Sequence, residues 1–406
     1  MSVYLIGTLD TKGREIAFVR DLLSGYGIQT RVIDAGSQLP PAIVPDITRE
    51  AVFHSAGTTI EAVQLKGDRG AAVTHAATGV ANLIRELHAQ GKVQGVLGLG
   101  GSAGTTIATA AMRALPIGIP KLMVSTLASG QTRPYVGDKD ILLLNSVVDL
   151  IGINRISREV LGQAARAMAG LVTLPHPAPA ATERPLIAAT MFGVTTACIT
   201  KAKEVLEAAG YEVLVFHATG NGGQAMESLI ADGLIAGVLD ITTTELADEL
   251  VGGTLTAGPT RLTAAGIHGV PQVISVGALD MVNFGPRETV PTKFAARKFH
   301  IHNANVTLMR TTPEENQLLG LEIARKAAAS TGPVAIMLPL QGVSAIDKAG
   351  QSFDDPQARE TLYDAIRQNH GAVELIELDN HINDPEFAVA ATNKLLEKLR
   401  VISCST

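Results

Sequence analysis

A glycine-rich turn that follows an apolar run carries the most distinctive chemistry in the sequence. Residues 93–99 form the apolar run, which passes directly into glycines and small hydroxyl residues. Glycine lets backbone N–H groups approach a phosphate, and the N-terminus of a following helix adds positive partial charge. We predict an anion-binding turn; the alternative is a tight strand-to-helix junction, since neither Walker A nor a full dinucleotide fingerprint is present. Its candidate ligand-binding residues are Gly100, Gly101, Ser102, Gly104 and Thr105.

Other turns in the first half of the chain also follow short apolar strands. Lys12 is the one cation among these turns and could pair with a phosphate, while Asp10 could hold a divalent metal such as Mg²⁺ or a ribose hydroxyl. In the alternative interpretation, Asp10 and Thr11 cap a helix and Lys12 is solvated. The predicted cofactor-binding residues in these turns are Thr8, Asp10, Thr11, Lys12, Gly36, Ser125, Thr126, Ser129 and Gly130.

The corresponding turns in the second half are more acidic. Asp240, Glu245 and Asp280, together with His217, are the candidate catalytic residues, because they could transfer protons or hold a metal. A structural alternative stays open for part of this set. Residues 242–244 followed by Glu245 also resemble the start of a helix with a capping box.

Two further features have weaker chemical interpretations. Cys198 follows two threonines at the expected start of a helix, where the helix dipole would lower the pKa of a thiol, but a small buried cysteine is the favoured interpretation. His300, His302 and His381 could form a metal site, although one His-X-His in a polar segment is a weak pattern.

Strands and helices must bring these turns together. Residues 3–7 form an apolar strand, the next segment has apolar side chains on one helical face, and residues 30–33 form a second strand. A strand, a helix and a strand within about thirty residues make a βαβ unit, which requires a parallel sheet. Because ligands bind at the carboxyl edge of such a sheet, we expect the turns of each half to converge there.

An internal repeat relates the two halves. Three blocks recur in the same order, and the first half carries roughly 41 additional residues between its first two blocks. We therefore predict an α/β fold with two Rossmann-like domains, each built on a parallel sheet, related by an internal repeat. The paired blocks are 4–36 with 187–219, 91–97 with 233–239, and 118–125 with 269–276.

A proline-rich segment marks the predicted domain boundary. Residues 174–185 contain four prolines and no apolar periodicity, as expected of a semi-rigid linker. The predicted domains are residues 1–173, which carry the glycine-rich turn, and residues 186–406, which carry the acidic turns.

Composition restricts the classes of function. With 33 basic and 39 acidic residues among 406, the net charge of −6 argues against binding nucleic acid through bulk electrostatics. The absence of tryptophan and the 3% aromatic content remove the stacking platforms of single-strand binders. Two distant cysteines, an N-terminus without a signal-peptide pattern and the lack of a long apolar segment predict a cytoplasmic protein without disulfides or membrane spans.

An ordered series of motifs carries a resemblance to a known family. The motifs are residues 8–12, 100–105, 115–121, 125–131, 191–196, 216–220, 238–245, 275–285 and 381–384. The chain resembles, over essentially its whole length, the family of the N-terminal ATP-binding domain of the tomato mosaic virus resistance protein. This resemblance implies two Rossmann-like subdomains, a homo-oligomer such as a dimer, and ATP bound by the turns of the first subdomain.

Three functional hypotheses follow. The first is an ATP-binding protein that could couple the nucleotide in the first domain to a small molecule at the acidic turns of the second. The second is a non-enzymatic regulatory or scaffold subunit. It would act with a separately encoded barrel-like partner, because the resemblance implies that the plant chain continues into such a domain. The third is a metal-dependent isomerase or hydrolase that uses the histidines.

Overall fold

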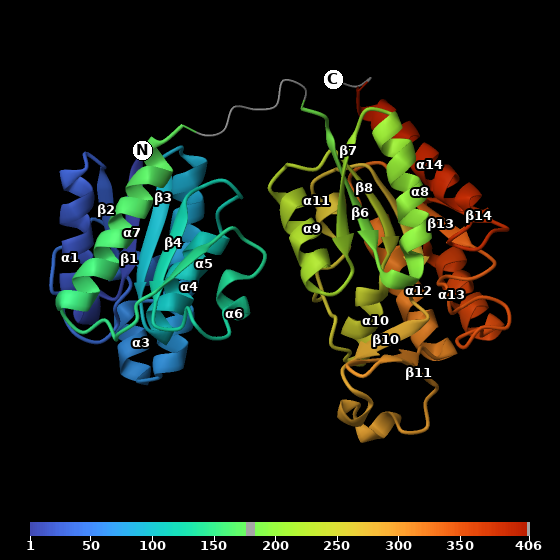
Figure 1. Ribbon diagram of the computed structural model, residues 1–406, viewed down its shortest axis with the longest axis horizontal. Helices are drawn as coiled ribbons and strands as arrows, with labels where there is room; N and C mark the ends of the chain where they lie inside the picture. The colour runs from blue at the N-terminus through green and yellow to red at the C-terminus, as the bar shows by residue number, and fades with distance from the viewer. Residues whose placement is uncertain (176–182, 404–406) are drawn as a thin grey trace. The chain divides into compact units, whose positions relative to one another are not determined.

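The computed structural model describes residues 1–175 and 183–403. It divides into two compact units, Met1–Ala178 and Pro179–Thr406 (Figure 1). Each unit is a parallel sheet covered by helices, which confirms the predicted α/β class with two Rossmann-like domains. The division falls inside the predicted linker 174–185, of which residues 176–182 lie outside the described residues.

The first unit is built on a five-stranded sheet with the order β2-β1-β3-β4-β5. All neighbouring strands are parallel. Alternate strand residues face opposite sides, so the central strands supply apolar side chains to two cores. The strands are β1 (Ser2–Gly7), β2 (Thr30–Asp34), β3 (Val93–Gly100), β4 (Lys121–Ser125) and β5 (Leu142–Asn145).

Helices cover both faces of this sheet. On one face, α1 (Leu9–Gly25) packs beside α7 (Arg155–Thr173); on the other, α4 (Arg69–Ala89) packs beside α5 (Ser102–Arg113) (Figure 1). The additional residues of the first unit form α2 (Arg49–Ser55) and α3 (Ile60–Lys66) and lead into α4, and α6 (Arg133–Val136) follows β4.

The second unit has a six-stranded sheet with the order β14-β13-β9-β8-β6-β7. Its strands are parallel throughout. They are β6 (Leu186–Met191), β7 (Glu212–His217), β8 (Gly237–Thr242), β9 (Gln272–Gly277), β13 (Val334–Pro339) and β14 (Glu374–Leu378). The helices are η1 (Gly193–Thr195), α8 (Thr196–Ala208), α9 (Asn221–Ala231), α10 (Thr244–Val251), α11 (Ala264–Ile267), α12 (Pro313–Ala328), α13 (Pro356–Asn369) and α14 (Pro385–Ser403).

A small antiparallel sheet extends the second unit (Figure 1). Its order is β10-β12-β11. The sequence did not indicate it, because its strands are only four or five residues long, β11 is polar and exposed, and two 3₁₀ turns interrupt the segment. The elements are β10 (Met281–Phe284), η2 (Arg287–Thr289), η3 (Thr292–Phe294), β11 (Phe299–Asn303) and β12 (Val306–Arg310).

The two large sheets share one strand order. Numbered from the first strand of its unit, each reads 2-1-3-4-5, and the second unit adds a sixth strand at the end. The repeated blocks of the sequence fall on equivalent strands: β1 with β6, β3 with β8, and β4 with β9. In sheets of this order, the topological switch lies between the first and third strands, and ligands bind at their carboxyl ends.

Candidate functional site

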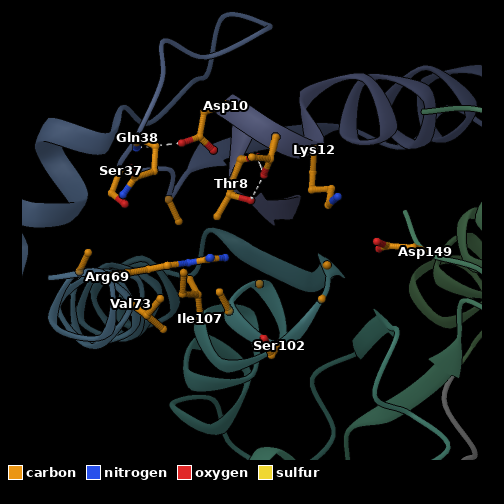
Figure 2. A pocket seen from close by; sticks show the side chains of 17 residues that line it. Thr8, Asp10, Lys12, Ser37, Gln38, Arg69, Val73, Ser102, Ile107 and Asp149 are labelled. Carbon is orange, nitrogen blue, oxygen red and sulfur yellow. Dashed lines mark hydrogen bonds between the residues drawn. The ribbon is translucent and has the colours of Figure 1, made fainter. Parts of the chain in front are cut away.

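A cavity of about 430 Å³ opens at the switch point of the first unit (Figure 2). It lies at the carboxyl ends of β1 and β3, and α4 forms a further wall. Eight of the predicted cofactor-binding residues converge on it from turns that are distant in sequence. They are Thr8, Asp10, Thr11, Lys12, Gly100, Gly101, Ser102 and Gly104.

Two helices begin at this cavity without a hydrogen bond from the side chain of their own N-cap residue, although the first N–H group of α1, that of Leu9, donates to Asp34 Oδ1 at 3.1 Å. The N-cap of α1 is Thr8 and that of α5 is Gly101, and neither side chain bonds to the first turn of its helix backbone. The predicted capping by Asp10 or Thr11 is therefore wrong, because α1 begins at Leu9. The N-terminus of α5 therefore presents N–H groups that no side chain accepts, and the N-terminus of α1 adds positive partial charge, which suits an anion.

The two adjacent glycines of the turn have different roles. A Cβ at Gly100 would lie 2.9 Å from the Cα of Gly104, so this glycine permits close packing of strand against helix. A Cβ at Gly101 would meet only the Thr126 hydroxyl, at 3.7 Å, and would project into open space. Of the pair, Gly101 is the residue at which a side chain would obstruct the cavity without disturbing the fold.

Two cationic side chains border the cavity. The Lys12 ammonium donates a hydrogen bond to the Leu150 carbonyl. Arg69, in the first turn of α4, reaches across the cavity towards Thr8 (Figure 2). Within the described parts of the chain, its guanidinium has no ion pair or hydrogen bond. Sequence reasoning missed Arg69 because it follows no strand.

Asp10 holds the loop after β2. Its Oδ2 accepts hydrogen bonds from the backbone N–H groups of Gln38 at 2.9 Å and Leu39 at 3.3 Å (Figure 2). Its Oδ1 is buried without a hydrogen-bond partner, and a Cβ at Gly36 would lie 2.7 Å from it. The carboxylate therefore positions one wall of the cavity, and Gly36 leaves room for it.

The remaining predicted cofactor-binding residues lie outside the cavity lining. The hydroxyls of Thr105 and Ser125 are buried 2.7 Å apart and connect the turns after β3 and β4. Ser125 Oγ also accepts a hydrogen bond from the backbone N–H of Leu127. The residues outside the lining are Gly36, Thr105, Ser125, Thr126, Ser129 and Gly130.

At the equivalent place in the second unit, a buried arginine binds the acidic turn. The Arg261 side chain is fully buried; it contacts the two carboxylate oxygens of Asp240 at 2.5 and 2.6 Å and Glu245 Oε2 at 2.6 Å. Thr190 Oγ1 donates a further hydrogen bond to Asp240. Burial and multiple donors satisfy both carboxylates, so the structure gives them a clear structural role.

Glu245 also occupies an anion position at a helix N-terminus. Its Oε1 accepts hydrogen bonds from the N–H groups of Gly220 at 2.7 Å and Gly223 at 3.1 Å, where α9 begins. The carboxylate thus caps a helix other than its own, in contrast to the capping box that the sequence suggested. Asp240 and Glu245 are together with Arg261 rather than open to a ligand.

Asp280 lies in a separate buried network. Ser344 Oγ donates to its Oδ2 at 2.8 Å, and its Oδ1 has no partner. Burial and the neighbouring Asp347 carboxylate raise the pKa of Asp280 to about 7, against the opposing effect of Arg310. His217 is exposed at the end of β7 beside Phe192, and among the described residues no hydrogen bond or ion pair joins it to these acids.

The predicted histidine metal site does not form. Both ring nitrogens of His381 are engaged, with the Ser344 carbonyl and the Asn383 N–H, whereas His300 lies beside Ser352. Across residues 1–175 and 183–403, no cluster of three His, Cys, Asp or Glu residues could hold a metal ion.

Cys198 is buried, and burial raises the pKa of its thiol to about 12, so it is unreactive. Cys404 lies outside the described residues. Within the described chain, no helix combines the length and apolar character that a bilayer crossing needs.

Comparison with known proteins identifies relatives along the whole chain. The N-terminal domain model of the uncharacterised protein family UPF0261 matches residues 1–177, and the C-terminal domain model matches residues 184–399. A UPF0261 protein from Clostridium tetani is 50% identical over 98% of both chains. The ToMV resistance protein Tm-1(GCR237) of Solanum lycopersicum is 41% identical over 99% of this chain and 57% of the tomato protein.

Solved structures give a weaker likeness. UDP-N-acetylglucosamine 2-epimerase from Rickettsia bellii aligns over 98% of this chain and 96% of that chain, with 9% identity and a TM-score of 0.23. A likeness at this level carries no argument about activity.

Proposed function

The chain belongs to the UPF0261 family through both of its units, and we propose that the first unit binds a nucleoside polyphosphate, ATP, in the cavity of Figure 2. One observation carries the proposal: the uncapped N-terminus of α5, the N-terminus of α1 and two cationic side chains border a single cavity at the topological switch point. Each element favours negative charge, and their convergence favours a ligand with more than one phosphate.

The environment of Asp34 favours a mononucleotide over a dinucleotide. In dinucleotide-binding folds, an acidic residue near the end of the second strand holds the adenosine ribose. Here Asp34 ends β2, but it accepts hydrogen bonds from the N–H groups of Leu9 and Gly36 and forms an ion pair with Arg49 at 2.8 Å. Both of its oxygens are engaged within the protein.

Asp149 fits Mg²⁺ better than Asp10 does. Mg²⁺ that accompanies a nucleotide is held by one or two carboxylates together with the phosphates. Asp10 Oδ2 is committed to the loop after β2 and its Oδ1 is buried against Gly36, whereas Asp149 is exposed in the cavity lining with only its Oδ1 engaged, by the Leu150 N–H. Mg²⁺ would neutralise phosphate charge, and Asp149 would orient it.

Calorimetric titration of the full chain with ATP tests the proposal. Gly101→Val should weaken ATP binding at least tenfold because it places a side chain in the cavity, and Lys12→Ala should weaken it several-fold because it removes a positive charge. Arg14→Ala is the matched control, since Arg14 is an exposed cation on the same helix outside the lining. If Gly101→Val and Lys12→Ala both bound ATP with unchanged affinity, ATP would not bind in this cavity.

A regulatory role without turnover is the second candidate, and the pairing of Asp240 and Glu245 with Arg261 favours it. Both carboxylates are committed to structure, so they are poorly placed to act on a substrate. The chain spans 57% of the tomato protein's length. In this candidate function the chain is a cytoplasmic homodimer that works with a separately encoded barrel-like partner. Nucleotide hydrolysis assays and light scattering test this candidate; ATP turnover that Asp280→Asn abolishes would contradict it.

A further inference from the structure

The cavity of the first unit has two chemically different ends. Thr8, Lys12 and Gly101 form a polar end where α1 and α5 begin. Ala72 and Val73 of α4, together with Ile107 of α5, line the cavity with aliphatic side chains. Figure 2 shows Val73 and Ile107 on the side nearer α4, and Lys12 and Asp149 at the opposite side.

We infer that this aliphatic end is a base subsite, so that the nucleotide lies with its base against α4 and α5 and its phosphates at the two helix N-termini. The inference rests on the proposed nucleotide binding and specifies its orientation. Apolar side chains favour the flat face of a base, whereas they would leave a phosphate without partners in a desolvated place.

Arg69 lies between the two ends. Its backbone starts α4 beside the aliphatic residues, and its guanidinium extends towards Thr8 at the polar end (Figure 2). A guanidinium has an apolar planar face and a fork of donors. With the base at the aliphatic end, Arg69 can therefore pack against the nucleoside and donate to a phosphate.

The loop after β2 adds polar groups to the base end. Asp10 fixes the backbone N–H of Gln38, and the Gln38 side chain remains exposed in the cavity lining. A primary amide presents a donor and an acceptor side by side, which fits the amino group and adjacent ring nitrogen of adenine. The ligand class is therefore an adenine nucleotide with at least two phosphates.

Apart from Ile107 of α5, the residues of the subsite lie in a connection that is longer in the first unit than in the second. Between β2 and β3 the chain forms α2, α3 and α4, whereas between β7 and β8 it forms only α9. Gln38 and Val73 both lie in the longer connection. The inserted residues thus account for a base-binding wall in one copy of the fold.

Titration with two probes, ATP and inorganic tripolyphosphate, separates the base subsite from the phosphate subsite. Val73→Asn, which places a polar side chain at the aliphatic end without adding charge, should weaken ATP binding several-fold and change tripolyphosphate binding less than twofold. Lys12→Ala should weaken both. Retained tripolyphosphate binding shows that Val73→Asn is folded. Gln38→Ala, at an exposed position, provides a second variant and should weaken ATP about threefold or more without affecting tripolyphosphate.

The possible failures are distinguishable. If the wild type binds tripolyphosphate as tightly as ATP, or if Val73→Asn and Gln38→Ala both leave ATP binding unchanged, the base subsite is wrong and the phosphate site stands. The base subsite is also wrong if both variants weaken the two probes equally. If the wild type binds neither probe, the proposed function itself is wrong.

Discussion

The topological switch points of the two units lie in sheets of the same strand order but carry different charged side chains. In the first unit, the turn after β3 is glycine-rich, and the Arg69 guanidinium enters an open cavity. In the second unit, the equivalent turn after β8 carries Asp240 and Glu245, and the Arg261 guanidinium is buried between them. Among the described residues, the guanidinium of the first unit therefore has no anionic partner, whereas that of the second unit is neutralised by buried carboxylates.

The difference shows how a repeated fold can separate binding from stability. At the start of α9, the Glu245 carboxylate accepts the N–H groups that an external anion would otherwise accept. At the start of α5, no side chain caps the helix. The N-terminus of α5 lacks the stabilisation that a capping side chain would provide and has cationic side chains nearby, which is consistent with a functional site.

The strongest test of this contrast removes each arginine in turn. Arg261→Ala should lower the free energy of unfolding of the second unit by about 3–5 kcal/mol, because it leaves Asp240 and Glu245 buried without their counter-ion. Arg69→Ala should change the stability of the first unit by less than about 0.5 kcal/mol, because Arg69 is exposed. Hydrogen exchange resolved by peptide measures each unit within the full chain; equal losses would contradict the contrast.

Glycine substitutions give a smaller effect of the same kind. A Cβ at Gly223 would lie 2.2 Å from Glu245 Oε2, whereas a Cβ at Gly101 would lie 3.7 Å from the nearest atom, Thr126 Oγ1. Gly223→Ala should therefore destabilise the second unit by about 1–3 kcal/mol through overpacking. Gly101→Ala is the matched control and should stay within about 0.5 kcal/mol. Urea unfolding checks both, and a neutral Gly223→Ala would show that Glu245 can leave the helix terminus at little cost.

Local sequence patterns were sufficient to predict the fold and part of the lining of the candidate cavity in the first unit. The apolar run before Gly100 and the strand before Thr8 indicated where two strands end, and the repeat indicated that each half forms its own sheet. Parallel strands bring their carboxyl ends to one edge, so the turns were expected to meet, and eight of the predicted residues line one cavity.

Pairing between side chains that are distant in the sequence could not be predicted from the sequence. Arg69 enters the cavity from a helix, and Arg261 lies in a connection without apolar periodicity, so neither follows a strand end. Spacing shows that Asp240 and Glu245 are near each other, but only the fold shows that a fully buried guanidinium binds both. Similarly, the commitment of Asp10 to the N–H groups of the loop depends on tertiary contact.

The pH dependence of stability should also differ between the units. The pKa of Asp280 in the second unit is raised to about 7 by burial and by Asp347, and the pKa of Asp248 is raised to about 7 by burial. Unfolded carboxyls titrate near 4, so between about pH 4 and pH 7 the folded unit binds more protons than the unfolded chain. Stability should therefore fall as pH rises through this window and level off above it.

Asp280→Asn should remove part of this slope, on the order of 1 kcal/mol between pH 5 and pH 7.5, because the amide keeps an acceptor for Ser344 without gaining charge. Asp149→Asn is the matched control, since Asp149 is exposed in the first unit and its substitution should leave the slope unchanged. Urea midpoints measured at several pH values give both slopes. If Asp280→Asn retained the full wild-type slope, the buried carboxyl would already be ionised in the folded protein, and the second unit would tolerate a buried negative charge that its arginines compensate.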